Sequence, residues 1–204
     1  MTGLGAAQSI TSSHRRYALI LPGNWAAIPM DDPDALKERV RQIVKERVPR
    51  DDRFATARRN MREDLLTNVT GARDSGATLY ALSLELLPGL PFPASLIAYE
   101  PGWPPEAPPA GEPSGRLAAA FPGAAVVEEA PVPTVRRATV RTRRLTATDT
   151  TVLDLTYWFA APDGGLVCTM VSVPDCPGVE PVTELFDMIA SSIHWAPPLE
   201  GDDR

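Results

Sequence analysis

Apolar residues recur at helical spacing in three stretches of the chain. The first covers residues 34–48, with carboxylates and a proline at its start and Pro49 at its end, which is typical of a helix. The second covers residues 55–71, about five helical turns. The third begins near Glu180-Pro181 and carries apolar side chains as far as Ile193. We therefore predict two successive helices early in the chain and one near its end.

Much of the remaining chain alternates between apolar and polar residues, as strands do. Residues 17–21 form a short apolar run that Pro22-Gly23 ends, and residues 77–87 alternate over a longer stretch, with residues 94–99 as their returning partner. Four more strands are predicted, the last three as an antiparallel meander: residues 124–128, 135–145, 150–161 and 166–173. The predicted fold is α+β, an antiparallel β-sheet flanked by helices.

Proline marks the predicted organisation of the chain. It occurs 22 times in 204 residues, about twice the usual share of roughly 5%. Six prolines lie in residues 100–115, which we expect to form an extended, exposed loop because proline cannot donate to a sheet. We expect a disordered leader over residues 1–14, one α+β domain over residues 15–196 and an acidic tail over residues 197–204.

Composition excludes several classes of protein. Hydrophobic residues make up 44% and charged residues 23%, as in proteins with a sizeable core, and the net charge of −6 does not suggest a nucleic-acid binder. No run approaches the ~20 apolar residues of a membrane span, and no signal peptide is recognised, so we expect a cytoplasmic protein. The spacing of Cys168 and Cys176 fits neither a redox nor a zinc motif and leaves their pairing open. No metal or cofactor motif is found.

The residues that could catalyse a reaction are few and isolated. Glu85 and Asp154 each fall in a strand pattern, where they fit the exposed half of the alternation. His194 closes the last helical pattern, and the neighbouring serines lie in no nucleophile motif. We therefore expect no enzymatic activity.

The candidate binding residues are basic and aromatic. Arg137, Arg141 and Arg143 share one face of a predicted strand, and Asp154 lies on the predicted partner strand. These arginines either pair with neighbouring carboxylates or form a platform for an anionic partner, and the first interpretation is the simpler. Trp103 in the proline loop is a further candidate contact. A second group of arginines is interleaved with acids, which indicates a solvated helix face: Arg50, Arg53, Arg58, Arg59 and Arg62.

Two motifs at the ends of the pattern resemble the PsbP-like superfamily. They are Leu21-Pro22-Gly23-Asn24-Trp25 and Leu185-Phe186-x-x-Ile189-x-x-Ser192-Ile193-x-Trp195. The resemblance implies an α-β-α sandwich with no catalytic residues to carry over. Members of the superfamily, among them a photosystem subunit, bacterial lipoproteins and adaptor-chaperones of secreted effectors, mainly bind other proteins. The paired helices at 34–72 and the proline insertion at 100–115 depart from a compact member.

Two functional hypotheses follow. The first is a non-catalytic module that binds another protein, an adaptor or chaperone linked to a secretion or toxin system, with contacts through the arginine strand and Trp103. The second is a small-ligand binder or hydrolase with a cavity between the sheet and the long helix. A convergent carboxylate or His194 in that cavity would favour the second. The sequence leaves homo-oligomerisation, the partner and any substrate open.

Overall fold

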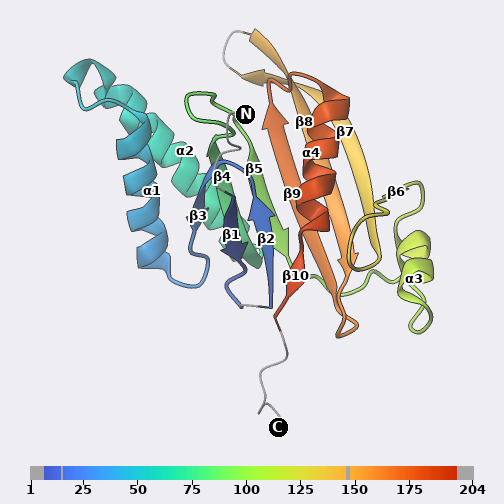
Figure 1. Cartoon of the computed structure of the whole chain (residues 1–204). Coiled ribbons are helices and arrows are strands. Elements are labelled where there is room, and N and C mark those ends of the chain that lie inside the picture. Colours follow the sequence, from blue (N-terminus) through green and yellow to red (C-terminus); the bar gives the residue numbers. More distant parts are fainter. Residues whose placement is uncertain (1–6, 15, 146–147, 197–204) are drawn as a thin grey trace.

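The computed structural model describes residues 7–14, 16–145 and 148–196, and for residues 143–145, 148 and 149 it describes the backbone alone. Its strands form a seven-stranded sheet of order β3-β4-β5-β9-β8-β7-β6 and a three-stranded sheet of order β1-β2-β10 (Figure 1). All strand pairs in the described residues are antiparallel. The predicted α+β class with an antiparallel sheet is confirmed.

The strands of the first half are β1 (Gln8–Thr11), β2 (Tyr17–Leu21), β3 (Asn24–Ile28), β4 (Ala77–Glu85) and β5 (Ser95–Tyr99). Those of the second half are β6 (Ala125–Val126), β7 (Thr134–Leu145), β8 (Thr148–Ala160), β9 (Leu166–Pro174) and β10 (His194–Trp195). The helices are α1 (Pro33–Arg47), α2 (Ala55–Asp74), α3 (Pro113–Ala120) and α4 (Val179–Ser191), and a 3₁₀ turn, Asp52–Phe54, precedes α2.

The large sheet is covered on both faces. On one face α1 and α2 pack against β3 and β4, where Val40, Ile43 and Val69 meet Ile28 and Tyr80. On the other face α4 and the three-stranded sheet bury a larger core (Figure 1). Because side chains alternate along a strand, β4 supplies residues to both cores. Helices on both faces agree with the layered arrangement expected from the sequence.

The predicted helices are confirmed, and the local chemistry explains where they begin. Asp32 precedes α1 and accepts hydrogen bonds from the backbone N–H groups of Asp34 (2.8 Å) and Ala35 (3.1 Å), while Pro33 occupies the first turn. The Asp32 carboxylate satisfies two donors that the helix leaves free, and these bonds lower its pKa. The β7-β8-β9 meander is also confirmed, except that residues 146–147 of its first turn lie outside the described residues.

Two short strands, β1 and β3, correct the predictions. The expected disordered leader over residues 1–14 is wrong for Gln8–Thr11, which forms β1 along β2 and buries Ile10. His14 lies in the turn after β1, with Nδ1 3.6 Å from the Glu100 carboxylate. Asn24-Trp25, interpreted as part of a turn, opens β3. β1 buries only Ile10, and in β3 the buried residues Trp25 and Ala26 are adjacent, so neither strand shows an alternation. Residues 1–6 and the acidic tail, 197–204, lie outside the described residues.

The two end motifs meet in the larger core. The ring of Trp25 lies edge-on to that of Phe186 at 6.5 Å, and its Nε1–H donates to the Pro22 carbonyl at 2.9 Å. Tyr17 and Trp195 lie 5.7 Å apart where β10 pairs with β2. The C-terminal helix and strand therefore hold the small sheet against the large one.

We predict that Gly23→Ala lowers the free energy of unfolding by about 2–4 kcal/mol, as strain and overpacking combine. Gly23 has a φ of +84° at the corner between the two sheets, and an added Cβ would lie 2.3 Å from the Glu85 carbonyl oxygen. Chemical denaturation measures the change. Gly89→Ala is the matched control, because φ is +77° there but nothing lies within 4 Å of the added Cβ. Equal losses for the two variants would contradict the role of the close packing.

Candidate functional site

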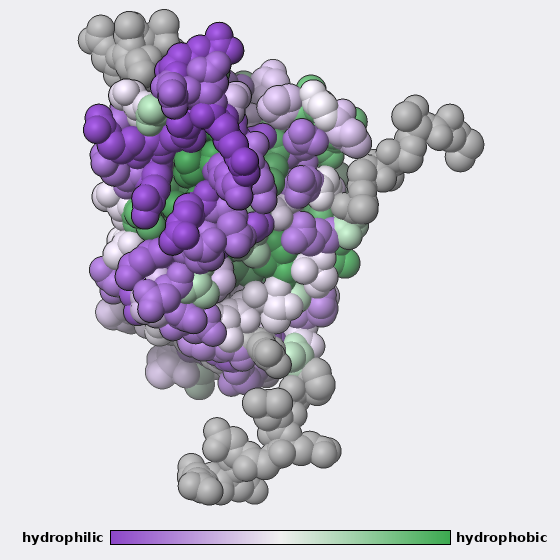
Figure 2. Space-filling view, turned by 90° about the vertical axis from the view of Figure 1, so that its left-hand side faces the viewer, coloured by the Kyte–Doolittle hydropathy of each residue, from purple (hydrophilic) through white to green (hydrophobic). Residues whose placement is uncertain are grey.

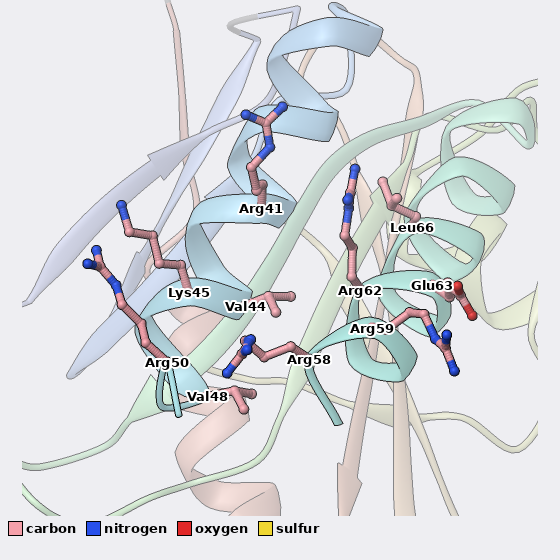
Figure 3. A pocket seen from close by; sticks show the side chains of 10 residues that line it. All are labelled: Arg41, Val44, Lys45, Val48, Arg50, Arg58, Arg59, Arg62, Glu63 and Leu66. Carbon is pink, nitrogen blue, oxygen red and sulfur yellow. The ribbon is translucent and has the colours of Figure 1, made fainter. Parts of the chain in front are cut away.

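A hollow opens where the C-terminal half of α1 lies beside the N-terminal half of α2. Its volume is about 680 Å³. We call it the α1–α2 groove. Three apolar and seven charged residues line it: Val44, Val48, Leu66, Arg41, Lys45, Arg50, Arg58, Arg59, Arg62 and Glu63 (Figure 3). Six of the charged side chains are cations and one is a carboxylate.

The floor of the groove is apolar because the two helices meet there. Val44 is buried, while Val48 and Leu66 are half-buried. Leu66 also packs against the core beneath α1 and α2. In Figure 3 the two valines extend from the α1 side toward α2. Figure 2, which views the molecule from this side, shows apolar surface in a hollow between hydrophilic side chains.

The cations form two rows along the groove. Arg41 and Lys45 are four residues apart on α1, and Arg58 and Arg62 are four apart on α2. On a helix this spacing places two side chains on one face, about 6 Å apart along the axis. Arg58 lies between the two helices near Val48 (Figure 3). A partner lying over the floor would therefore meet positive charge on both sides.

Most of this positive charge is not neutralised by the fold. Arg41 pairs with Glu38 at 2.9 Å. Arg58 donates to the backbone carbonyl oxygens of Pro49 and, at 2.9 Å, Asp51, so it holds the loop that closes one end of the groove. Within the described residues, four cations of the rim have no ion pair and no side-chain hydrogen bond: Lys45, Arg50, Arg59 and Arg62.

Composition conceals this arrangement. Residues 31–74 contain eleven Lys or Arg and ten Asp or Glu, so the segment is nearly neutral. Folding separates the charges, because six cations and one carboxylate surround the groove and the other acids lie elsewhere. The sequence predicts a solvated helix face, and Arg50, Arg59 and Arg62 are exposed, but their gathering around one groove does not show in the sequence. The sequence feature that could have indicated the groove is the position of the cations, which flank the apolar stripe on both helices. The groove suits a ligand that is both anionic and apolar.

Among the described side chains of the predicted arginine strand, Arg141 is neutralised by a carboxylate. Arg141 on β7 makes two hydrogen bonds to Asp154 on β8, one of them at 3.1 Å, and this contact raises the pKa of Arg141. The interpretation of these arginines as partners of neighbouring carboxylates is thus confirmed for Arg141. The side chain of Arg143 lies outside the described residues.

Arg137 is held by aromatic and backbone contacts. Its guanidinium lies 5.6 Å from the ring centroid of Trp158, within cation–π range, and donates to the Pro122 carbonyl at 3.2 Å. The α2 arginines and this strand do not form one surface, because β5, β9 and β8 separate β4 from β7. A binding role for Arg137, Arg141 and Arg143 stays a prediction.

Trp103 is engaged in the packing of the proline loop. Its Nε1–H donates to the Gly164 carbonyl in the β8–β9 turn at 2.8 Å, and the Arg116 guanidinium lies 4.0 Å from its ring centroid. The half-buried ring also packs against the small core around Leu117. The loop lacks strands but is not extended throughout, because it turns where the Ala107 N–H donates to the Pro104 carbonyl at 2.9 Å, and its last residues, from Pro113, begin α3. These contacts give Trp103 a structural role, and its binding role stays a prediction.

The candidate catalytic residues do not converge. Glu85 accepts a hydrogen bond from the Gly89 N–H at 3.4 Å, Asp154 pairs with Arg141, and His194 is exposed on β10. No contact between any two of Glu85, Asp154 and His194 is found in the described part of the chain.

A second hollow, of about 360 Å³, lies between the helical pair and the sheet. Ile43 and Met61 line it from the helices, and Leu82 and Val152 line it from the sheet. Arg47 at its edge donates to the Leu84 carbonyl at 3.0 Å. The described residues that line it include no carboxylate and no histidine. It lies between the sheet and the helical pair, as the second hypothesis requires, but its described lining lacks the carboxylate or His194 that would favour that hypothesis.

The two cysteines are both free, which answers the question of their pairing. Cys168 is buried on β9, and burial raises the pKa of its thiol to about 12. Cys176 is half-buried, and its thiol donates to the Gly178 carbonyl at 3.4 Å. Among the described residues, no group of three or more His, Cys, Asp or Glu side chains could hold a metal ion. In the same residues, no helix has the length and apolar character needed to cross a membrane.

Comparisons with known proteins identify no family. No family model matches the chain, and no curated protein matches it. The structure is similar to a crystal structure of a protein from Bacteroides thetaiotaomicron VPI-5482, with a TM-score of 0.47 and 8% sequence identity. The alignment covers 97% of this chain and 50% of that protein, so the chain spans about half the length of the protein it matches.

We predict that the double variant Lys45→Gln/Arg62→Gln is at least as stable as the wild-type protein. Each substitution removes one like-charge pair at i, i+4, which costs a helix about 0.2–0.5 kcal/mol. The free energy of unfolding should therefore rise by about 0.5 kcal/mol in low salt, and the gain should shrink in high salt as screening increases. Arg141→Gln is the control and should be destabilising, because it removes the hydrogen bonds that Arg141 donates to Asp154. A double variant less stable than wild type would show that the rim cations stabilise the fold.

The thiols give a prediction about reactivity. At pH 8 Cys176 should react with a thiol reagent in the native protein, whereas Cys168 should react only after unfolding. The raised pKa of Cys168 keeps its thiol protonated at this pH, and only the thiolate is nucleophilic. A Cys176→Ser variant should show no fast reaction. Rapid labelling of Cys168 in that variant would show that this part of β9 opens readily.

Proposed function

We propose that the protein is a non-catalytic protein-interaction module that holds an acidic segment of a partner protein in the α1–α2 groove. The observation that carries the proposal is an apolar floor framed by six cations, four of which have no partner within the described residues. Unpaired like charges are unfavourable in the free protein, and an acidic partner would relieve the repulsion on binding.

The charges and the floor would contribute in different ways. Exposed ion pairs contribute roughly 0–1 kcal/mol each, so the rim mainly provides steering and selection. Apolar burial contributes about 25 cal/mol per Å², so covering the exposed parts of Val48 and Leu66 would add to the affinity, whereas Val44 is already buried. A partner needs both properties to use the whole groove.

The groove is a better docking surface than the arginine strand. On β7 the charge of Arg141 is matched by Asp154, and Arg137 is already bound to Trp158 and Pro122. An acidic partner would have to replace these contacts before it gained new ones. At the α1–α2 groove, Lys45 and Arg62 could pair with a partner without breaking a contact described here.

The role proposed for such a module is that of an adaptor or chaperone. The resemblance of its end motifs to the PsbP-like superfamily, whose members mainly bind proteins, supports this role. The link to a secretion or toxin system rests on that resemblance alone.

A second candidate is a small-ligand binder that uses the hollow between α1, α2 and the sheet. Its volume of about 360 Å³ and apolar lining would suit a small apolar molecule. A hydrolase is less favoured, because Glu85, Asp154 and His194 do not converge.

We predict that Lys45→Glu/Arg62→Glu lowers the capture of a stoichiometric protein partner from the native lysate at least tenfold. The substitution places two carboxylates beside the partner's acids. Arg137→Glu/Arg141→Glu is the comparator, since it changes the net charge by the same amount on the strand that the sequence analysis singled out. Affinity capture with mass spectrometry measures both, and thermal melting confirms that each variant folds.

The comparator makes the result specific. Loss of capture by the strand variant alone would overturn the groove as the docking surface and favour the arginine strand. A wild-type protein that elutes alone and retains a small molecule in native mass spectrometry would contradict the interaction module and favour the second candidate.

A further inference from the structure

We propose that the segment held in the α1–α2 groove is an amphipathic helix that carries acidic residues on both flanks of its apolar stripe. This inference rests on the proposed function and names the chemistry of the partner. It follows from the position of the cations, which stand on both sides of the floor and not on one.

A helix suits the groove because it satisfies its own backbone hydrogen bonds. The floor is made of the side chains of Val44, Val48 and Leu66 and presents no sheet edge. An extended peptide laid over these residues would bury backbone N–H and C=O groups without partners, and extended peptides usually bind by adding a strand to a sheet. A third helix can instead place its side-chain ridge in the depression between α1 and α2.

The spacing of the cations specifies where the acids must stand. Arg41 and Lys45 follow each other on α1 at about 6 Å of axial rise, as do Arg58 and Arg62 on α2. A helix lying nearly along the pair repeats its side chains at the same interval. Acids four residues apart on each flank of the stripe would therefore meet a row of cations on each side, as flanking charges do in coiled coils.

Two of the rim cations already make contacts within the protein, and this affects which cations a partner can bind most strongly. Arg58 is held by loop carbonyls and Arg41 by Glu38, so the strongest contacts should go to Lys45 and Arg62. Glu63 belongs to the α2 rim, on the side of that helix turned away from α1 (Figure 3). Acids on the partner's two flanks therefore meet cations before they meet this carboxylate.

A membrane surface matches the groove less well. The apolar floor lies in a hollow below long charged side chains (Figure 2). A flat anionic bilayer would contact the rim and leave the floor uncovered. A narrow helix can reach both.

The test compares two synthetic peptides of identical composition, net charge and length, about 20 residues each. Both carry the same apolar stripe. In the first, glutamates flank the stripe on both sides, and in the second the same glutamates lie on the opposite face. We expect the flanking isomer to bind the full-length protein at least tenfold more tightly by fluorescence anisotropy or calorimetry. Lys45→Glu/Arg62→Glu should abolish this preference, and Val48→Ser should weaken the flanking isomer severalfold.

The other outcomes overturn the inference in distinguishable ways. Equal affinities would show that net charge alone attracts the peptides. Failure of both isomers to bind, together with groove-dependent capture of a native partner, would reject the helix and leave the proposed function standing. If neither peptide binds and no native partner is captured through the groove, both the helical partner and the proposed function are rejected. Groove-dependent binding to vesicles of phosphatidylserine and phosphatidylcholine, stronger than to either peptide, would assign the groove to a membrane.

Discussion

The packing of α1 and α2 on one face of the seven-stranded sheet is the interaction on which the rest of the candidate site depends. Val40 and Ile43 of α1 and Val69 of α2 are buried against β3 and β4, so neither helix can rotate about its axis without exposing apolar surface. At the edge of this core Val44 is buried while Val48 and Leu66 are half-buried, and the two helices leave a hollow beside these residues. The helix orientation that buries Val40, Ile43 and Val69 against the sheet therefore leaves Val48 and Leu66 half-buried on the floor of the groove.

The same orientation determines where the charges gather. Charged residues beside the apolar residues of a helix lie at the edge of any groove that those apolar residues line. On both α1 and α2, the cations lie beside the apolar residues that line the α1–α2 groove. Like charges at i, i+4 are unfavourable on a helix surface. The proposed function would account for these like charges, which do not stabilise the fold. Stability given up at a binding surface is common in proteins.

The arginine strand shows how differently a sheet treats the same residue type. Arg141 and Asp154 are cross-strand neighbours on the β7-β8 ladder, and this register brings opposite charges together within the fold. Arg137 finds an aromatic ring and a carbonyl in the same way. Five arginines in one strand are therefore conspicuous in the sequence, yet those whose side chains are described are mostly satisfied by neighbours. The arginines of α2 are interleaved with acidic residues along the sequence, but around the α1–α2 groove the cations outnumber the carboxylates.

The sequence by itself determined the elements that carry a long periodic pattern. Residues at helical spacing predicted α1, α2 and α4, and alternation together with turn chemistry predicted β4, β5 and the β7-β8-β9 meander, because these patterns reflect burial along a single element. The short strands β1, β3 and β10 were missed, because β1 has one buried residue and β10 has none, and the buried residues of β3 include an adjacent pair, so no period shows. Only the tertiary structure decided that Arg41 and Lys45 of α1 and Arg58 and Arg62 of α2 line the same groove with an apolar floor. Which residues share a rim depends on how two helices turn toward each other, and that is set by the sheet beneath them.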